Sequence, residues 1–141
     1  MEKSNPQNYY EFPYVKFHGK YYPLIPIVLK NRKKTVSTFA LIDSGASISV
    51  FRPEIAEALG VIKKSKKEIR LGTANGGVDI HVVKMGIEVE DTSFSAQIGF
   101  SKKYAASFNI LGRAGIFSRF SICFNEIMKT VVMVPLEKIS I

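Results

Sequence analysis

The sequence predicts a mainly β domain that closes into a barrel and carries one or two short helices. About nine short segments rich in β-branched and aromatic residues follow one another at close spacing, separated by turns with Gly, Asn and Lys. Only residues 53–60 have clear helix signals. Strands do not alternate with long helices, which argues against a parallel sheet of βαβ units. Hydrophobic residues make up 46% of the chain, enough for one packed core.

The first half of the chain predicts a series of strands that leads to one acidic turn. Residues 14–22 predict a hairpin that turns at residues 18–20, where Gly19 separates two aromatic-rich halves. Residues 25–29 extend to a basic turn at residues 31–34. The next strand, residues 35–42, is β-branched and apolar and runs directly into Asp43.

The second half predicts a helix, further strands and a closing hairpin. Residues 53–60 predict the helix, because Pro53 stands in its first turn and Gly60 supplies a stop signal. Further strands are predicted over residues 68–71, 77–83, 85–89 and 94–100, with an Asn-Gly turn within residues 73–77. Residues 112–120 can form a second short helix, and residues 121–124 and 130–134 predict the hairpin.

A single domain is predicted over residues 11–141, preceded by a flexible segment over residues 1–10. The chain starts with polar residues, and no apolar run is long enough to span a bilayer, so a cytoplasmic protein is expected. Cys123, the one cysteine, lies in an apolar stretch and is predicted to be buried and inert. His18 and His81 are far apart in the sequence, so neither a metal nor another cofactor is expected.

The net charge of +8 has two interpretations. Basic residues cluster within residues 30–34, 63–67 and 102–103, and each cluster follows an apolar segment. Solvated loops are the favoured interpretation, and a nucleic-acid surface is the alternative. Nucleic-acid binding beyond a weak, nonspecific attraction is not expected, because the clusters lack interleaved aromatic residues, although Tyr104 follows Lys103.

Asp43 is delivered by an apolar strand into a Ser-Gly turn, within Leu41-Ile42-Asp43-Ser44-Gly45-Ala46. A buried carboxylate is costly without a partner. The placement therefore indicates either a structural Asx turn, in which Asp43 bonds its own backbone, or an acid with a chemical task. Asp79 and Asp91 are the rival acids, but neither precedes Ser-Gly. The Asp-Ser-Gly turn alone favours the structural interpretation.

A second element changes this balance. Residues 110–113 read Ile-Leu-Gly-Arg, about 70 residues after Asp43, and the Gly-rich residues 73–77 lie between the two. In this order the three elements resemble the retropepsin-like (retroviral-type) aspartic peptidases, and the resemblance runs over residues 35–124. It implies an acid-protease half-domain of the single-domain cellular type, which hydrolyses peptide bonds without a cofactor.

The resemblance implies a role for each matching residue. Asp43 would be the catalytic carboxylate, and Ser44 would hydrogen-bond across a dimer axis. Gly45 would let the substrate backbone approach closely, and Gly112 would pack behind the catalytic loop. The substrate would be bound by Ala46, Ser47 and Ile48 of the loop and by Ala74, Asn75, Gly76 and Gly77 of a glycine-rich flap.

Two features depart from the family pattern. Retroviral enzymes carry Asp two residues after this Gly, where it pairs with the Arg of Gly-Arg. Here that position is Ser47, so Arg113 needs another acceptor or another role. The chain also continues beyond residue 124 through the closing hairpin, so a dimer sheet would be built differently from the viral one.

One Asp-Ser-Gly per chain leads to a homodimer. Aspartic peptidases need two carboxylates that face one water, and a two-fold axis supplies Asp43 twice. The expected partners are therefore a second copy of the chain and a peptide or protein substrate, without a membrane. The alternative is a catalytically weak or inactive module of this fold that binds peptides or an acidic partner, for which Ser47 and the basic surface leave room. A small RNA-binding β-barrel is the least favoured class.

Overall fold

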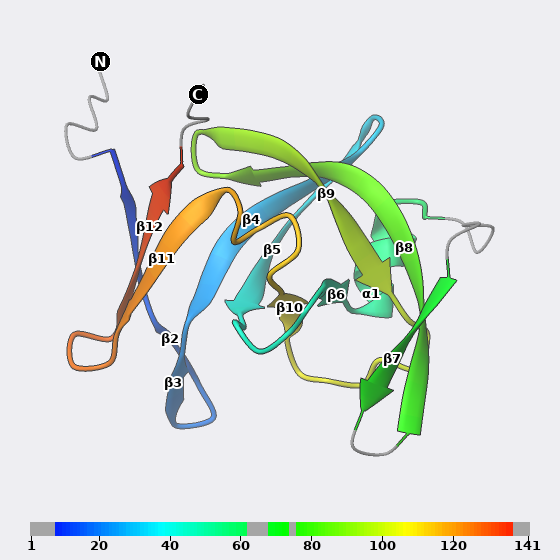
Figure 1. Cartoon of the computed structure of the whole chain (residues 1–141), viewed down its shortest axis with the longest axis horizontal. Coiled ribbons are helices and arrows are strands. Elements are labelled where there is room, and N and C mark those ends of the chain that lie inside the picture. The colour runs from blue at the N-terminus through cyan, green and yellow to red at the C-terminus, as the bar shows by residue number, and fades with distance from the viewer. Residues whose placement is uncertain (1–7, 62–67, 74–75, 137–141) are drawn as a thin grey trace.

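Six strands close into a barrel in the computed structural model, which describes residues 8–61, 68–73 and 76–136. The sheet order is β4-β5-β10-β6-β9-β8-β7, and β4 also pairs with β8, so that β7 extends the sheet beyond the closed ring (Figure 1). The bounds are β4 Leu24–Asn31, β5 Lys34–Ile42, β6 Ser49–Phe51, β7 Glu68–Thr73, β8 Gly76–Val89, β9 Thr92–Phe100 and β10 Asn109–Leu111. The predicted mainly β, barrel-like fold is confirmed.

Alternate residues of the strands fill the barrel. In β4, Ile25, Ile27 and Leu29 are buried, whereas Pro26 and Lys30 are exposed. This period of two places one face of each strand in the core. Burying a side chain of this size stabilises the fold by about 1.5–3 kcal/mol. The same alternation fixes the strand register, because a slip by one residue would turn the apolar face towards water.

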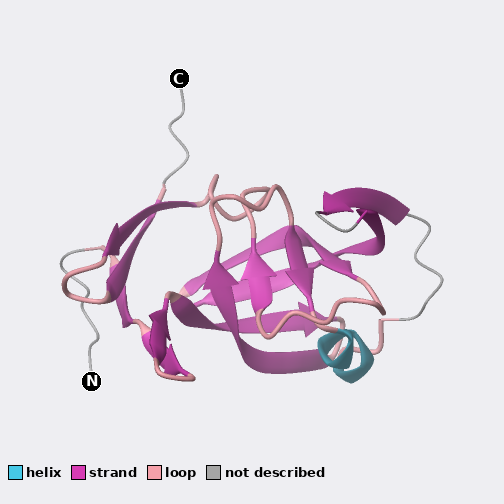
Figure 2. Cartoon of the chain, turned by 90° about the horizontal axis from the view of Figure 1, so that it is seen from below, coloured by secondary structure: helices cyan, strands magenta, loops and turns pink. Residues whose placement is uncertain are grey.

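A three-stranded sheet lies at one end of the molecule, and the β7–β8 hairpin lies at the other (Figures 1 and 2). The strand order of the three-stranded sheet is β1-β12-β11, with bounds β1 Tyr10–Pro13, β12 Thr130–Pro135 and β11 Phe120–Asn125. Phe12, Phe120, Val131 and Met133 of this sheet belong to the same buried cluster as the barrel residues. The two parts therefore share one hydrophobic core.

Several predicted elements are confirmed, and one is longer than expected. The hairpin over residues 14–22 forms from β2 (Val15–Phe17) and β3 (Lys20–Tyr22). The helix over residues 53–60 forms as α1 (Pro53–Ala58). The strands predicted over residues 77–83 and 85–89 are one strand, β8, because Lys84 pairs with Gln97 and the ladder with β9 continues through it.

Residues 112–120 do not form the short helix that the sequence allowed. They form consecutive turns between β10 and β11, in which the N–H groups of Ile116 and Phe117 both donate to the carbonyl of Arg113, at 3.2 and 3.0 Å. Gly115 has a φ of +78°, in the left-handed region. A right-handed helix needs a negative φ at every residue, so Gly115 interrupts it.

Cys123 is exposed, so the prediction of a buried thiol is wrong. Its neighbours Ile122 and Phe124 pair with Met133 and Val131, which are fully buried. Because successive side chains of a strand point to opposite faces, Cys123 lies on the outer face of the three-stranded sheet. Apolar sequence neighbours did not indicate burial here, because only one face of this sheet meets the core.

The buried Tyr14, just before β2, hydrogen-bonds to the turn between β11 and β12. The Tyr14 hydroxyl donates to Glu126 Oε2 at 2.8 Å, and the Tyr14 N–H donates to the Lys129 carbonyl at 2.7 Å. Burial, followed by the hydrogen bond and charge of Glu126, raises the pKa of Tyr14 to about 12. The hydrogen bond from Tyr14, supported by one from Lys129, holds the pKa of Glu126 below its ordinary value.

Replacing Tyr14 by Phe should lower the melting temperature most near neutral pH. A lowered Glu126 pKa means that folding favours the ionised carboxylate, so its contribution is present above the ordinary glutamate pKa and is lost as pH falls through the lowered value. The gap between wild type and Tyr14→Phe should therefore shrink below about pH 4. Thermal unfolding followed by circular dichroism across the acid range measures it. A constant gap would show that Glu126 is not the relevant partner.

No helix within the described ranges is long and apolar enough to cross a membrane. The same ranges hold no group of three or more His, Cys, Asp or Glu side chains that could bind a metal ion.

Candidate active site

Asp43 follows β5 directly and is held by the neighbouring strand. β5 and β10 run parallel, with Leu111 opposite Ile42, and the Asp43 N–H donates to the Leu111 carbonyl at 3.0 Å. The residue is half-buried, at the end of the strand and at the start of the loop over residues 43–48. The two parallel strands thus fix the backbone from which the carboxylate projects.

The turn itself orients the carboxylate. Asp43 Oδ1 accepts the Gly45 N–H at 2.9 Å, and the Asp43 carbonyl accepts the Ala46 N–H at 3.2 Å. A Cβ on Gly45 would lie 3.2 Å from Asp43 Oδ1, which is a tight approach. The local Asx turn expected from a purely structural aspartate is present, and it also fixes the orientation that a reacting carboxylate requires.

Gly112 lies against the backbone of this loop. A Cβ at position 112 would stand 2.3 Å from the Ile48 carbonyl oxygen and 2.9 Å from that of Ala46, so any side chain would displace the loop. The Gly112 N–H donates to Ser49 Oγ at 3.0 Å, and Ser49 is fully buried. The turn after β10 is therefore the support on which residues 43–48 rest.

Arg113 has a main-chain acceptor in place of a carboxylate. Its guanidinium Nη1 donates to the Ser44 carbonyl at 2.7 Å, and its N–H donates to the Ala46 carbonyl at 2.9 Å. The next residue, Ala114, donates its N–H to the Ser47 carbonyl at 3.0 Å. The loop is thus attached to residues 112–114 although position 47 carries no acid.

The predicted flap residues are only partly described. β7 and β8 pair from Glu68 opposite His81 to Thr73 opposite Gly76, so the hairpin closes at this end. Gly76 and Gly77 begin β8, whereas Ala74 and Asn75 lie outside the described residues. The rival acids lie elsewhere: Asp79 is exposed on β8, and Asp91 is exposed in the β8–β9 turn.

The loop over residues 101–108 carries Tyr104, whose pKa responds to the charge of Asp43, and the sequence analysis did not assign this residue to the site. The half-buried Tyr104 donates its hydroxyl to the Phe108 carbonyl at 2.9 Å. Burial raises the pKa of Tyr104, the charge of Asp43 raises it further, and the charge of Arg52 lowers it. Tyr104 therefore stands within the electrostatic range of Asp43. The sequence signal for Tyr104 is its position after Lys102 and Lys103, and that pattern indicates base stacking in nucleic-acid binding and not a role near a carboxylate.

The buried side chain of Asn109 hydrogen-bonds to the backbone of two neighbouring segments. Its Oδ1 accepts the Arg52 N–H at 2.9 Å, and its Nδ2 donates to the Phe39 carbonyl at 3.0 Å. Asn109 therefore bridges β5 to the residue after β6, and it satisfies backbone groups that would otherwise be buried without a partner.

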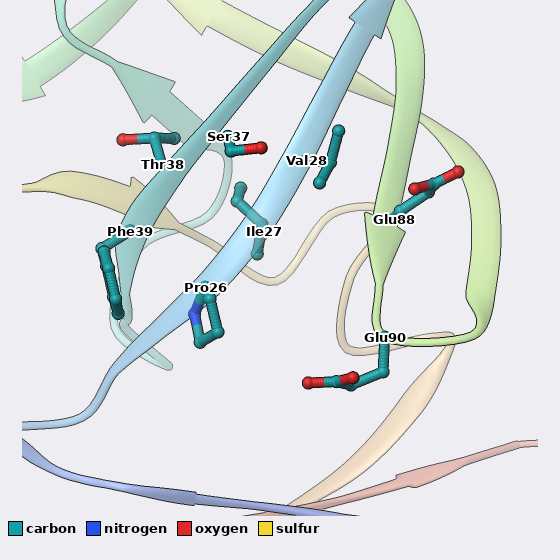
Figure 3. Close-up of a pocket in the computed structure, with 8 residues that line it drawn as sticks. All are labelled: Pro26, Ile27, Val28, Ser37, Thr38, Phe39, Glu88 and Glu90. Carbon is teal, nitrogen blue, oxygen red and sulfur yellow. The ribbon is translucent and has the colours of Figure 1, made fainter. Parts of the chain in front are cut away.

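Two surface pockets lie away from the loop over residues 43–48. The first, of about 320 Å³, is on the outer side of β4 and β5, with Pro26, Val28 and Phe39 as apolar walls and Glu88 and Glu90 beyond them (Figure 3). Glu88 is ion-paired with Lys30. The second, of about 310 Å³, is lined by α1 residues and by residues at the start of the 101–108 loop. Neither includes Asp43.

Comparison with known proteins agrees with this architecture. A sequence model of the aspartyl protease family matches residues 30–98, which run from the end of β4 into β9 and include Asp43. No curated protein matches this sequence. A retropepsin-like aspartic protease from Rickettsia conorii superposes with a TM-score of 0.67 at 19% identity, over 86% of this chain and 97% of that one.

A second solved structure is more distant. The EIAV protease complexed with the inhibitor HBY-793 superposes with a TM-score of 0.52 at 18% identity, over 70% of this chain and 88% of that one. At these identities the two structures establish the shared fold, and the match over residues 30–98 adds the sequence signature. Residues 30–98 thus match the aspartyl protease family, a class of hydrolases, and the chain has the retropepsin-like fold.

Proposed function

We propose that the chain is an aspartic endopeptidase that works as a homodimer, with Asp43 from each copy in one shared active site. The observation that carries the proposal is the half-buried carboxylate of Asp43, fixed by Gly45 and supported by Gly112. The sequence has a single Asp-Ser-Gly turn, and the reaction needs two carboxylates, so the second must come from a second copy.

The shared site would work through one proton held between two aspartates. Two like charges about 3 Å apart cannot both be ionised, so one carboxyl stays protonated. The ionised Asp43 acts as the general base and takes a proton from water, and the protonated Asp43 of the partner polarises the scissile carbonyl and then acts as the acid. The proton belongs to the pair and not to either residue.

The residues around the pair supply alignment and binding in this proposal. Ser44 hydrogen-bonds across the axis, and Gly45 allows the substrate backbone to come close. The substrate lies along Ala46, Ser47 and Ile48 and is covered by the flap over residues 74–77. Closure of the flap excludes water other than the one that reacts.

The three-stranded sheet offers a surface for the second copy. Cys123 and Val132 pair on its outer face, and Val134 and Leu136 are 38% and 49% exposed. Within the described residues β11 is an edge strand of this sheet, and exposed apolar side chains beside an open edge favour pairing with another chain. We therefore place the dimer interface at the β11–β12 hairpin.

The interpretation as an inactive binding module had two grounds: Ser47, where retroviral enzymes have an acid, and the basic surface. Arg113 donates to the Ser44 carbonyl, so the loop keeps its attachment without that acid. This contact removes the first ground and so supports the enzyme.

Mixing wild type with an excess of Asp43→Asn chains tests the proposal. With nine variant chains for each wild-type chain, random pairing leaves about one wild-type chain in ten with a wild-type partner, so activity per wild-type chain should fall about tenfold. Cleavage of a peptide library, with sedimentation to confirm exchange between dimers, measures the effect. Undiminished activity in the mixture would mean that one chain suffices, and this would contradict the shared site.

A further inference from the structure

The pocket on the outer side of β4 and β5 has no part in the proposed mechanism. β4 pairs with β8 over residues 28–30, and this pairing ends before Pro26, which has no backbone N–H to donate. A pocket of about 320 Å³ lies where the two strands separate, between β4 and the turn that joins β8 to β9 (Figure 3). Its walls therefore include strand residues that face outwards and Glu90 of the turn.

The side chains that form these walls project from one face of the sheet. Pro26 lies opposite Phe39, and Val28 lies opposite both Ser37 and Glu88. Directly opposed residues of antiparallel strands, and residues two apart along one strand, point to the same face. Phe39 is 51% exposed, so an apolar side chain bound in the pocket would cover a ring that now faces solvent.

The rim of the pocket is acidic, although the chain as a whole has a net charge of +8. Glu88, Glu90 and Asp91 fall within four positions, and Glu90 and Asp91 are exposed. Lys30 is ion-paired with Glu88. Among the described residues no basic side chain pairs with Glu90, whose carboxylate extends towards Pro26 in Figure 3. Glu90 is therefore available to a cation that binds beside apolar walls, whereas an anion such as a phosphate would be repelled.

The size and openness of the pocket favour part of a polypeptide as its occupant. Pockets that enclose small organic ligands usually measure about 300–1,000 Å³ and bury most of the ligand. This pocket is at the lower limit of that range and is open to solvent. It therefore fits one apolar side chain of a longer chain, whose neighbouring residues reach the acidic rim.

We propose that this outer pocket binds a segment of a partner protein that has an aliphatic residue with Lys or Arg two positions away. Residues two apart in an extended chain point to the same side, so the aliphatic side chain enters the pocket while the cation reaches Glu90. The pocket does not include Asp43, so the inference goes beyond the proposed peptidase function and does not depend on it. The residues of the outer pocket that carry the proposal are Pro26, Val28, Ser37, Phe39, Glu88 and Glu90.

Binding of three labelled peptides tests the proposal. The peptides have Arg-Ser-Leu-Ser-Arg, Glu-Ser-Leu-Ser-Glu or Arg-Ser-Ser-Ser-Arg between the same Gly-Ser flanks. Fluorescence anisotropy is measured with the full chain carrying Asp43→Asn, so that no peptide is cleaved in the proposed scheme. The first peptide should bind about tenfold more tightly than the second, because attraction is replaced by repulsion at the rim. It should also bind about tenfold more tightly than the third, which lacks the Leu side chain that the pocket buries.

Two substitutions in the outer pocket should change these preferences separately. Glu90→Lys should abolish the preference for the basic Leu peptide over the acidic one, because the rim then repels Arg. Phe39→Ser should reduce the preference for Leu over Ser by about threefold or more and leave the charge preference unchanged. About 0.5 M salt should weaken the charge preference and leave the preference for Leu.

Glu57→Lys and Tyr21→Ser are the matched controls. Glu57→Lys makes the same change in net charge at an exposed position of α1, and Tyr21→Ser removes an aromatic ring that is 50% exposed on β3. Neither residue lines the outer pocket. Both variants should keep the two preferences. An equal loss of the charge preference in Glu57→Lys would mean that the total charge selects the peptide, and it would overturn the inference.

Three other results would also overturn the inference. The first is no binding of the basic Leu peptide at about 1 mM, the concentration at which even a weak site is occupied. The second is a preference for the acidic Leu peptide before any change in the pocket, which would show that the net charge of the chain outweighs its acidic rim. The third is that Glu90→Lys or Phe39→Ser separates dimers in sedimentation and leaves peptide binding unchanged, which would assign the outer pocket to a second copy of the chain.

Discussion

Asp43→Asn should abolish peptide hydrolysis and leave the fold intact. The amide oxygen of Asn can still accept the Gly45 N–H that Asp43 Oδ1 accepts at 2.9 Å, so the turn should persist. An amide cannot take a proton from water, and the loss of a general base costs about 10²–10⁴-fold in rate. Dimers should be equally or more stable, because two facing carboxylates no longer repel each other. Peptide cleavage and sedimentation on the same preparations measure the two effects.

The pH dependence of the wild type provides the control for this variant. Both the fully ionised and the fully protonated pair are inactive, so the rate should rise and then fall with pH. The acid side reports loss of the base, and the alkaline side reports loss of the shared proton. Equal cleavage by wild type and Asp43→Asn would remove Asp43 from the mechanism, whereas no cleavage by either across many peptides would leave the binding module as the function.

Gly112→Ala should destabilise the protein by about 1–3 kcal/mol or more, the usual cost of inserting a methyl group into a closely packed site. The new Cβ would stand 2.3 Å from the Ile48 carbonyl oxygen, so either the 43–48 loop or the turn after β10 must move. Activity should fall even in the folded fraction, because the moved loop carries the Asp43 carboxylate out of alignment. Urea unfolding measures the first effect, and the rate per folded dimer measures the second.

Gly86→Ala is the matched control for this substitution. A Cβ on Gly86 would meet its nearest neighbour, Lys30 Cβ, at 3.5 Å, which is an ordinary contact. This variant should therefore keep both its stability and its activity. If Gly112→Ala behaves like Gly86→Ala, the close approach behind the loop has no structural consequence, and the proposed support for Asp43 is wrong.

The sequence predicted those elements that carry their own local signal. The strands over residues 35–42 and 94–100 show β-branched or alternating patterns, and Pro53 and Gly60 mark the helix. β6 and β10 have three residues each, too few to show a period, and they are strands because the barrel pairs them with their neighbours. The expected helix over residues 112–120 was wrong because Gly115 adopts a left-handed φ of +78°, which the sequence did not indicate.

In the candidate site, too, the sequence predicted residues that belong to a short motif and did not predict contacts between distant segments. Asp43 and Gly112 belong to short motifs in which neighbouring residues carry the signal. The acceptor of Arg113 was not predictable, because a main-chain carbonyl leaves no trace in the sequence. Tyr104 was missed for a related reason: the path of the 101–108 loop, which brings it within the electrostatic range of Asp43, leaves no trace in the sequence.

The bond from Arg113 to the Ser44 carbonyl has a consequence for protein engineering. Every amino acid offers a carbonyl at position 44, so this attachment of the loop does not depend on a particular side chain at position 44 or at position 47. Position 47 is exposed and is free of the structural duty that an acid performs in retroviral enzymes. A library randomised at this position can therefore explore new cleavage preferences while the scaffold around Asp43 stays in place.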